Sequence, residues 1–248
     1  MLTLTRHDRT LHFDDAGFTE LPYVYRPITQ DRFYEEAFLQ HIRSLGRIGQ
    51  YIDVGAHLGT HTIWFATLCP ATHVHAVEPV ERYASVIRRN IAANGLGDKV
   101  TIHRTGLAAQ RGRATNYMSP EHQLGFIDGE ATGVTEEFPV ERMDDVVRGP
   151  VAVIKLDVEG MEASVLQGAS RILSRDRPVI FAEARTPEEA KEIGRQIAPF
   201  GYRPTGQVFN ASPTYEFIAP ARKGLERLRP AYRRLPDGLR SRLRRLAR

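Results

Sequence analysis

The sequence predicts an α/β fold with a doubly wound, mostly parallel sheet and an antiparallel hairpin at its C-terminal edge. Short apolar runs alternate with helix-like stretches, which is the pattern of parallel strands joined by crossover helices. The near-continuous apolar runs 151–154 and 179–182 are typical of strands buried on both faces. Two later runs, 202–209 and 214–218, flank the turn-like segment 210–213 and predict the edge hairpin.

The elements are expected in a regular order along the chain. Alternating apolar residues on both sides of the polar stretch 7–9 predict an N-terminal hairpin, and the apolar spacing over 30–45 predicts one helical face. Residues 118–137 have no clear period, and both a substrate lid and a surface loop fit them. The sheet strands are expected at 50–54, 73–78, 100–103, 151–157 and 179–183, with helices near 60–68, 81–94, 161–174 and 187–198.

Composition and segment boundaries indicate one principal domain with two additions. The 248 residues are 42% hydrophobic and 26% charged, which is ordinary for a globular protein. We divide the chain into an N-terminal hairpin and helix extension, 1–45, a principal domain, 46–220, and a basic amphipathic tail, 221–248. The single cysteine, the early charges of the N-terminus and the lack of a long uncharged apolar run predict a cytoplasmic protein.

The tail carries the basic excess of the chain. It holds eleven of the 34 Lys and Arg but two of the 30 Asp and Glu, so residues 1–220 have a net charge of −5. Leucines recur in the tail at intervals of three and four, and Pro230 and Pro236 divide it into short helices. A membrane surface or a partner subunit is the favoured partner, although a disordered tail fits the composition as well. Nucleic acid is not expected, because the acidic body would repel phosphates.

A glycine-containing turn follows the first strand of the principal domain. In the run Asp53-Val54-Gly55-Ala56-His57-Leu58-Gly59, Gly55 allows a tight turn with backbone close to a ligand. Gly59 lets the next helix begin hard against the strand, and the helix N-terminus offers free N–H groups. The run lacks the second glycine of the G-x-G-x-x-G pattern that cradles a pyrophosphate. The turn therefore suits a nucleoside ligand without a pyrophosphate better than NAD.

Further candidate ligand-binding residues stand at the ends of the strands. Glu78 ends the second strand, where its carboxylate can accept hydrogen bonds from both hydroxyls of a ribose. Asp53 could hold the positive amino group of a methionine moiety, and backbone at Leu107 could contact an adenine. A turn and an acid about 20 residues apart across a strand–helix–strand unit are more specific together than either is alone.

Three stretches carry a resemblance to a known family. The chain resembles the FkbM-type family of class I S-adenosylmethionine (SAM)-dependent methyltransferases over roughly residues 50–185, in the runs Tyr51–Gly59, Val77–Pro79 and Ile154–Glu162 followed by Val165–Ala169. The third run is the most distinctive, because generic methyltransferases lack it. The resemblance implies a Rossmann-like fold and transfer of a methyl group to oxygen. It also implies SAM binding by Asp53, Gly55, Gly59 and Glu78.

One position departs from the family pattern. His57 stands where the family often has a smaller polar residue such as Asn. Two interpretations stay open: His57 caps the following helix, or it contacts the cofactor. His61, one helical turn later, is interpreted as a cofactor-pocket residue or as part of the helix surface.

Carboxylates at the fourth and fifth strands are the candidate catalytic groups. The resemblance favours an acceptor hydroxyl on a sugar, a glycan or a small natural product, and such a hydroxyl needs a proton acceptor. Asp157 is the predicted base and Glu183 the second catalytic carboxylate, with Glu159 and Glu162 nearby. Such a cluster could also bind the acceptor or a divalent cation, but carboxylates alone rarely decide a metal, so no metal site is predicted. Lys155 is expected to face away from them and to be structural.

Two other classes of function are weighed against methyl transfer. An NAD-linked oxidoreductase or epimerase would need a pyrophosphate-binding glycine loop and a Tyr-x-x-x-Lys pair, and the sequence has neither. A non-catalytic membrane- or RNA-associated protein that retains the fold would rely on the basic tail. SAM is the cofactor that the residues and the resemblance together favour.

Overall fold

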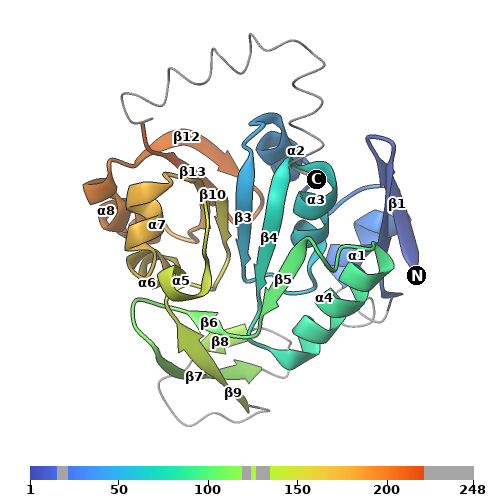
Figure 1. The fold of residues 1–248 in the computed structure, drawn as a ribbon, viewed down its shortest axis with the longest axis horizontal. Helices are drawn as coiled ribbons and strands as arrows, with labels where there is room; N and C mark the ends of the chain where they lie inside the picture. Colours follow the sequence, from blue (N-terminus) through green and yellow to red (C-terminus); the bar gives the residue numbers. More distant parts are fainter. Residues whose placement is uncertain (16–21, 119–123, 127–134, 221–248) are drawn as a thin grey trace.

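A seven-stranded sheet forms the centre of the computed structural model, which describes residues 1–15, 22–118, 124–126 and 135–220 (Figure 1). Its strands are β3 (Gly49–Val54), β4 (Ala71–Val77), β5 (Val100–His103), β10 (Val151–Leu156), β11 (Val179–Glu183), β12 (Arg203–Phe209) and β13 (Thr214–Ile218). Their order is β12-β13-β11-β10-β3-β4-β5, and the five strands from β11 to β5 are parallel. Strand β13 pairs antiparallel with both β11 and β12. The predicted fold class and its edge hairpin are therefore confirmed.

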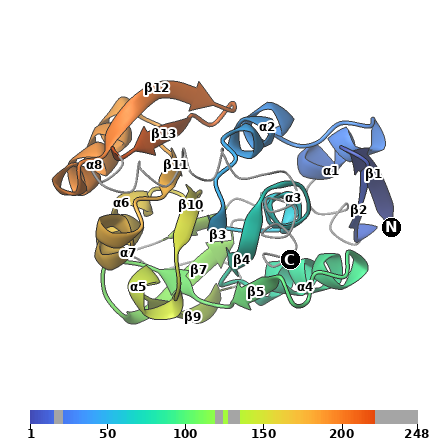
Figure 2. The same cartoon turned by 45° about the horizontal axis from the view of Figure 1, so that its top comes forward.

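Helices cover both faces of the sheet (Figures 1 and 2). One layer contains α2 (Glu36–Ser44), α3 (Thr60–Leu68) and α4 (Glu81–Ala93), and the other contains α5 (Met143–Val146), α6 (Glu162–Gln167), α7 (Ser170–Arg175) and α8 (Pro187–Ile197). The two layers bury two separate apolar clusters against the sheet, because successive strand residues point to opposite faces. A 3₁₀ turn, Ala198–Phe200, leads from α8 into β12.

The N-terminal hairpin packs on the principal domain. Strands β1 (Leu2–Arg6) and β2 (Arg9–Phe13) pair antiparallel, and both turn residues between them have positive φ, as a two-residue hairpin turn requires. Asn90 and Asn94 of α4 accept hydrogen bonds from the backbone N–H groups of Asp14 (2.7 Å) and His12 (2.9 Å). The side-chain amides of Asn90 and of Asn94, which follows the last residue of α4, thus pair with backbone groups at the free edge of β2. The predicted hairpin is present, and its apolar residues join the core of the domain.

The helix predicted over 30–45 begins later than expected. Helix α1 spans Pro22–Thr29, and α2 begins at Glu36. The chain between them turns at Asp31 and Glu35, which have φ values of 52° and 55°. Left-handed residues interrupt a right-handed helix, so the apolar spacing across 30–35 belongs to a turn.

The helix predicted over 161–174 is broken at Gly168. A Cβ on Gly168 would lie 2.2 Å from the carbonyl oxygen of Ala108, so the chain passes too close for any other residue. The Asp144 carboxylate then accepts the N–H groups of Arg171 (2.7 Å) and Ile172 (3.0 Å) at the start of α7. Asp144 thus pairs backbone N–H groups at the start of α7, and the close approach of Ala108 explains Gly168 of the family-like run as a structural residue.

A second, four-stranded sheet lies beyond the carboxyl ends of β4 and β5, in the lower part of Figure 1. Its strands are β6 (Gly106–Leu107), β7 (Gly112–Met118), β8 (Leu124–Phe126) and β9 (Thr135–Glu141), in the order β6-β9-β7-β8. The expectation of an irregular segment over 118–137 is wrong where β8 and the start of β9 pair with β7. Residues 119–123 and 127–134 lie outside the described residues, so the lid hypothesis stays a prediction.

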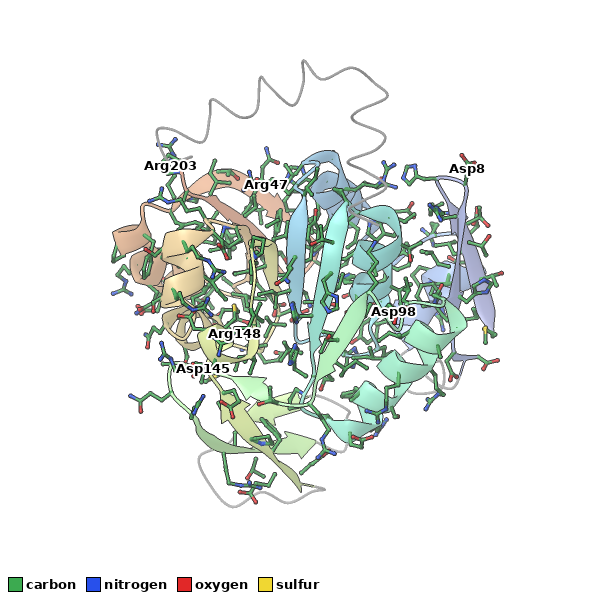
Figure 3. All side chains as sticks on the ribbon, viewed as in Figure 1. Asp8, Arg47, Asp98, Asp145, Arg148 and Arg203 are labelled. Carbon is green, nitrogen blue, oxygen red and sulfur yellow. The ribbon has the colours of Figure 1, made fainter. Side chains whose placement is uncertain are left out.

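Asp8 and Arg203 lie at the periphery of the molecule in Figure 3, whereas Asp53, Glu78 and Lys155 are among the charged side chains that are buried. Among the described residues, no helix combines the length and the apolar character needed to cross a bilayer. The basic tail, 221–248, lies outside the described residues. Its proposed partners are therefore untested by the fold.

Candidate active site

A polar cavity of about 410 Å³ opens at the carboxyl ends of β3, β4 and β10, where open α/β sheets bind their ligands. It lies between the first turn of α3 and the N-terminal segment that carries α1. Its lining residues are Tyr23, Val24, Tyr34, Gly55, Ala56, His57, Thr60, His61, Glu78, Tyr83, Lys155, Asp157, Glu159 and Arg185. Three of the predicted cofactor-binding residues and the predicted base thus share one cavity.

The bend after β3 depends on Gly55. Its φ is +71°, and a Cβ there would lie 1.9 Å from the backbone oxygen of Asp157. The N–H groups of Gly55 and Ala56 both donate to the carbonyl oxygen of Val77, at 3.1 and 3.0 Å. The glycine therefore lets the ends of three strands meet at one point, and the close neighbour is protein backbone.

Gly59 starts helix α3 in a left-handed conformation, with φ +76°. A Cβ on Gly59 would lie 3.1 Å from Cγ1 of Ile87 in α4. The expectation that this glycine allows close packing against the strand is therefore corrected: the close contact is with the neighbouring helix.

His57 lines the cavity and does not cap the helix. Its φ is +52°, a conformation in which Asn and His are enriched among non-glycine residues, which agrees with the Asn that the family often has here. Its backbone N–H donates to Oε2 of Glu78 (2.9 Å), and its ring packs edge-on against Tyr83. Within the described residues no side chain hydrogen-bonds to the start of α3 at Gly59, so the capping interpretation is wrong. Burial lowers the pKa of His57 to about 4, which leaves the imidazole neutral at pH 7.

Glu78 follows β4 directly and is buried, with 3% of its surface exposed. Its Oε2 accepts the His57 N–H, and its Oε1 accepts the N–H of Val80 at 3.0 Å. Burial raises the pKa of Glu78 to about 7. Because a carboxylate has about four acceptor positions, two backbone bonds leave room for two further donors from the cavity.

An apolar cavity of about 300 Å³ adjoins the polar one, and Gly55 lines both. Leu107 of β6 is among its walls, with Val77, Pro79 and Val140. The N–H of Ala108 donates to the carbonyl oxygen of Glu141 at 3.0 Å, so that group is already paired. Leu107 therefore contributes apolar surface to this pocket.

Lys155 lies at the centre of the charged residues, contrary to expectation. Strand alternation places residues 155 and 157 on the same side, and the β10–β3 register sets Lys155 beside Asp53. Its Nζ lies 3.3 Å from Oδ1 of Asp53 and 3.4 Å from Oδ2 of Asp157, and it donates to the carbonyl oxygen of Gly55 at 3.1 Å. Burial would lower the pKa of Lys155, but the carboxylates of Asp157 and Asp53 outweigh it and raise the pKa.

Asp53 is fully buried behind Lys155 and is not a lining residue of the cavity. Its Oδ2 accepts the hydroxyl of Thr62 at 2.6 Å. Its Oδ1 has no hydrogen bond within the described chain, although Lys155 lies at ion-pair distance. Asp53 is therefore the buried counter-ion of Lys155 and does not reach the cavity itself.

Asp157 and Glu183 form a proton-sharing pair. Their carboxyl oxygens and one of Glu159 all lie within 4.8 Å of one another. Burial and the neighbouring Asp157 raise the pKa of Glu183 to about 8. Burial also acts to raise the pKa of Asp157, but Lys155 and a hydrogen bond from Glu183 hold it below its ordinary value. The two carboxyls therefore titrate as a pair, in which the pKa of Glu183 is raised and that of Asp157, which lines the cavity, is lowered.

The other two predicted acids have different surroundings. Glu159 forms an ion pair with Arg185 at 3.1 Å at the mouth of the cavity. Glu162 is buried and accepts the N–H of Val158 at 2.9 Å, so it stabilises the loop after β10. Three acids of the kind found in cation sites do converge, at Asp157, Glu159 and Glu183, and nothing else in the described chain points to an ion there.

The N-terminal segment contributes a carboxylate to the site that no sequence pattern predicts. Glu35 faces the site from the turn before α2, and its Oε2 lies 3.4 Å from Nε2 of His61. Burial raises the pKa of Glu35 to about 7 and lowers that of His61 to about 4. His61 is 5% exposed, so its interpretation as helix surface is wrong. No motif identifies Glu35, because its position depends on the left-handed turn that directs it inward.

The comparison with known sequences decides the family. A family model described as the methyltransferase FkbM domain matches residues 53–204, which is more than half of the chain. The chain belongs to the FkbM methyltransferase family. SAM dependence follows from the family, and an NAD-linked oxidoreductase is no longer a competing class. No protein of curated function matches the chain in sequence.

The solved structure of an FkbM methyltransferase agrees with this fold. The chain is similar to the methyltransferase FkbM from Methylobacillus flagellatus KT, with 18% identity and a TM-score of 0.53, over 84% of this chain and 56% of that one. The chain thus spans just over half the length of that structure. An O-methyltransferase from Bacillus cereus, crystallised with SAH, has 15% identity and a TM-score of 0.49, over 84% of this chain and 92% of that one.

Proposed function

We propose that the chain transfers the methyl group of SAM to a hydroxyl of a sugar, a glycan or a small natural product. The observation that carries the proposal is the meeting of two cavities, one apolar and one polar, at Gly55, with the polar one lined by Glu78 and Asp157. The family supplies the reaction class. The two cavities supply places for an adenosyl group and for an acceptor.

The residues present fit SAM. Glu78 retains two acceptor positions for ribose hydroxyls, and Leu107 offers apolar surface to an adenine. Asp53 is buried behind Lys155, so its proposed part in binding the amino group of SAM is indirect, through the position of Lys155. Gly55, which lines both cavities, and Gly59 give the turn after β3 its left-handed conformations. His57 lies in the same turn and lines the polar cavity next to Glu78. When bound, SAM supplies a methyl group on a cationic sulfonium, which is already an electrophile.

The Asp157–Glu183 pair is the proposed proton acceptor. Asp157 is ionised and lines the cavity, so its Oδ atoms can accept the proton of an acceptor hydroxyl. Glu183 does not line the cavity, and it acts through Asp157 as a neutral hydrogen-bond donor. Lys155 holds Asp157 in place and limits its basicity until the acceptor approaches.

The charge of the cavity favours a neutral acceptor. Carboxyl groups of Glu78, Asp157 and Glu159 line it, against the cations Lys155 and Arg185, both of which are paired with carboxylates. An anionic acceptor would meet like charges there. The rings of Tyr23 and Tyr34 pack against each other at the same cavity and offer apolar surface to the face of a sugar ring.

Transfer of labelled methyl from SAM to a panel of neutral hydroxylated acceptors tests this function. We expect turnover by the wild type, and at least about a 100-fold loss of kcat in Asp157→Asn, the range in which general-base catalysis contributes. SAM binding should persist in that variant. Turnover of Asp157→Asn at the wild-type rate would remove Asp157 as the base.

The basic tail 221–248 is proposed to bind a membrane surface or a partner subunit, which would place a cytoplasmic enzyme at the membrane periphery. The support is its amphipathic pattern of leucines and arginines. Binding to anionic vesicles should fall on deletion of 221–248, while methyl transfer to a soluble acceptor is retained. Equal vesicle binding by both chains, or loss of transfer, would contradict this proposal.

A further inference from the structure

A cluster of imidazoles lies on β4 and β5, outside the lining of both cavities. His73 and His75 are on β4 and His103 is on β5. These residues alternate with Val74, Ala76 and Val100, which face the apolar core under α3 and α4. The histidines therefore lie on the other face, and in Figure 1 no helix of the described residues passes in front of β4 and β5. Thr101 beside them is exposed.

The tautomers of the central pair follow from their partners. His75 Nε2 lies 3.3 Å from the amide oxygen Oε1 of Gln50. Because an amide oxygen only accepts, Nε2 carries the proton and Nδ1 of His75 has the lone pair. That lone pair faces Nε2 of His103 at 2.9 Å, so His103 donates to it. Two ring nitrogens thus converge on one point at the surface of the sheet.

This arrangement has the geometry of two metal ligands. Imidazole nitrogens bind Zn²⁺ at about 2.0–2.1 Å, so two of them on one tetrahedral ion lie about 3.3–3.4 Å apart, and the two rings would have to separate slightly from their present 2.9 Å to admit it. A metal would replace the shared proton after that proton moves from Nε2 to Nδ1 of His103, with no change in the charge of either ring. Gln50 supplies the oxygen partner that orients a ligating histidine through its other nitrogen.

His73 offers a third ligand. Its ring centroid lies 5.0 Å from that of His75, and its Nε2 bonds to the hydroxyl of Thr101 at 2.8 Å. The ring nitrogens of the three histidines do not all lie within 4.8 Å of one another, so His73 would have to leave Thr101 and rotate toward the pair to act as a ligand. Imidazole ligands favour late first-row cations such as Zn²⁺, Cu²⁺ and Ni²⁺ over Mg²⁺ or Ca²⁺.

We propose that His75 and His103, with His73 as third ligand, bind a late first-row divalent cation on the open face of β4 and β5. The site is independent of the methyl-transfer proposal. Its position is adjacent to the active site, because the His103 carbonyl accepts the N–H of Glu78 at 3.1 Å. The acidic cluster of Asp157, Glu159 and Glu183 is the rival location for a cation, and the experiment must separate the two.

Calorimetric titration of the full chain with Zn²⁺ tests the proposal. We expect one ion per chain, at least about a 100-fold weaker affinity in His103→Gln, and about 10–100-fold weaker affinity in Gln50→Leu, as for removal of a partner that orients a ligand. His12→Gln, a partly buried strand histidine elsewhere, is the matched control and should bind as the wild type does. Loss of binding in Glu159→Gln and not in His103→Gln would overturn the proposal, as would no binding by the wild type.

A spectroscopic readout keeps the test informative if a variant fails to fold. Electron paramagnetic resonance of the wild type with one equivalent of Cu²⁺ should show hyperfine coupling to imidazole nitrogens, and His73→Gln should show fewer coupled nitrogens. A spectrum with oxygen ligands alone would overturn the proposal.

Discussion

Nζ of Lys155 lies 3.3 Å from Oδ1 of Asp53, between two neighbouring parallel strands at the same register position. The same ammonium lies 3.4 Å from Asp157, so one buried cation links the carboxylate under the glycine bend to the proposed base. The ammonium of Lys155 therefore links the glycine bend, through Asp53 and the Gly55 carbonyl, to the proposed base Asp157. Substitutions of Lys155, of Gly55 and of Glu183, the partner of Asp157, test whether these residues depend on one another.

Removal of the Lys155 ammonium should destabilise the fold. Lys155→Met leaves the buried carboxylate of Asp53 without its ion-pair partner, and breaking a buried pair in this way costs roughly 3–5 kcal/mol of unfolding free energy. Urea denaturation measures the loss. Lys191→Met, at an exposed lysine of α8, is the control and should be within about 0.5 kcal/mol of the wild type. Equal stability of the two variants would show that the buried pair contributes nothing.

The bend at Gly55 should tolerate no side chain. In Gly55→Ala the new Cβ would lie 1.9 Å from the Asp157 carbonyl oxygen, and the φ of +71° adds strain of about 1–2 kcal/mol. We expect both a lower melting temperature and loss of SAM binding, measured by thermal unfolding with and without the cofactor. Gly97→Ala, where nothing lies within 4 Å of the added methyl, should retain both properties. Normal binding by Gly55→Ala would mean that the bend is dispensable.

The unliganded protein should lose stability as the pH rises from about 6.5 to about 8. The pKa values of Glu35 and Glu78 are raised to about 7 and that of Glu183 to about 8, all from 4.5, so the folded state binds more protons than the unfolded chain in this range. Stability from these carboxyls is fully present below pH 4.5 and is lost as pH passes through the folded pKa values. Below about pH 6.5 the opposite contribution of His57, His61 and His75, whose pKa values burial lowers to about 4, offsets that of the carboxyls. Melting temperatures between about pH 6.5 and about pH 8 measure the slope.

Glu183→Gln separates one of these groups from the others. The Gln amide can still donate to Asp157 but cannot ionise, so the melting temperature should fall less steeply between pH 7 and pH 8.5 than in the wild type. In the same variant the rate of methyl transfer should lack the rise near pH 8 that ionisation of the pair gives the wild type. Identical pH profiles in the two proteins would argue against a shared proton.

Much of the central fold was predictable, because its determinants are local. The strands β5, β11 and β13 and the helix α3 have the bounds that periodicity indicated, and Gly55 and Glu78 meet as the turn-and-acid pattern predicts. The break at Gly168 could not be predicted, since it depends on the distant backbone of Ala108. The pairing of β8 with β7 depends in the same way on contacts that periodicity does not encode.

The candidate site was predicted less completely than the fold. The position of Lys155 beside Asp157 could have been predicted from the sequence, because residues 155 and 157 lie two apart on one strand and therefore share a face. The expectation that Lys155 faces away was wrong for this reason. The contact between Glu35 and His61 could not be predicted, because it requires a left-handed turn at Glu35 in a segment that carries no motif. Burial, which sets the raised pKa of Glu183, likewise follows from packing and cannot be read from the residue type.

The central claim is that Glu78 and the bend at Gly55 hold the adenosyl group, and calorimetric titration of SAM into Glu78→Gln tests it most directly. Loss of a charged hydrogen-bond acceptor costs roughly 1.5–3 kcal/mol, which is about a 10- to 150-fold weaker affinity. Glu81→Gln, at the exposed acid three residues later, should bind SAM as the wild type does. An unchanged SAM affinity in a folded Glu78→Gln protein would contradict the account.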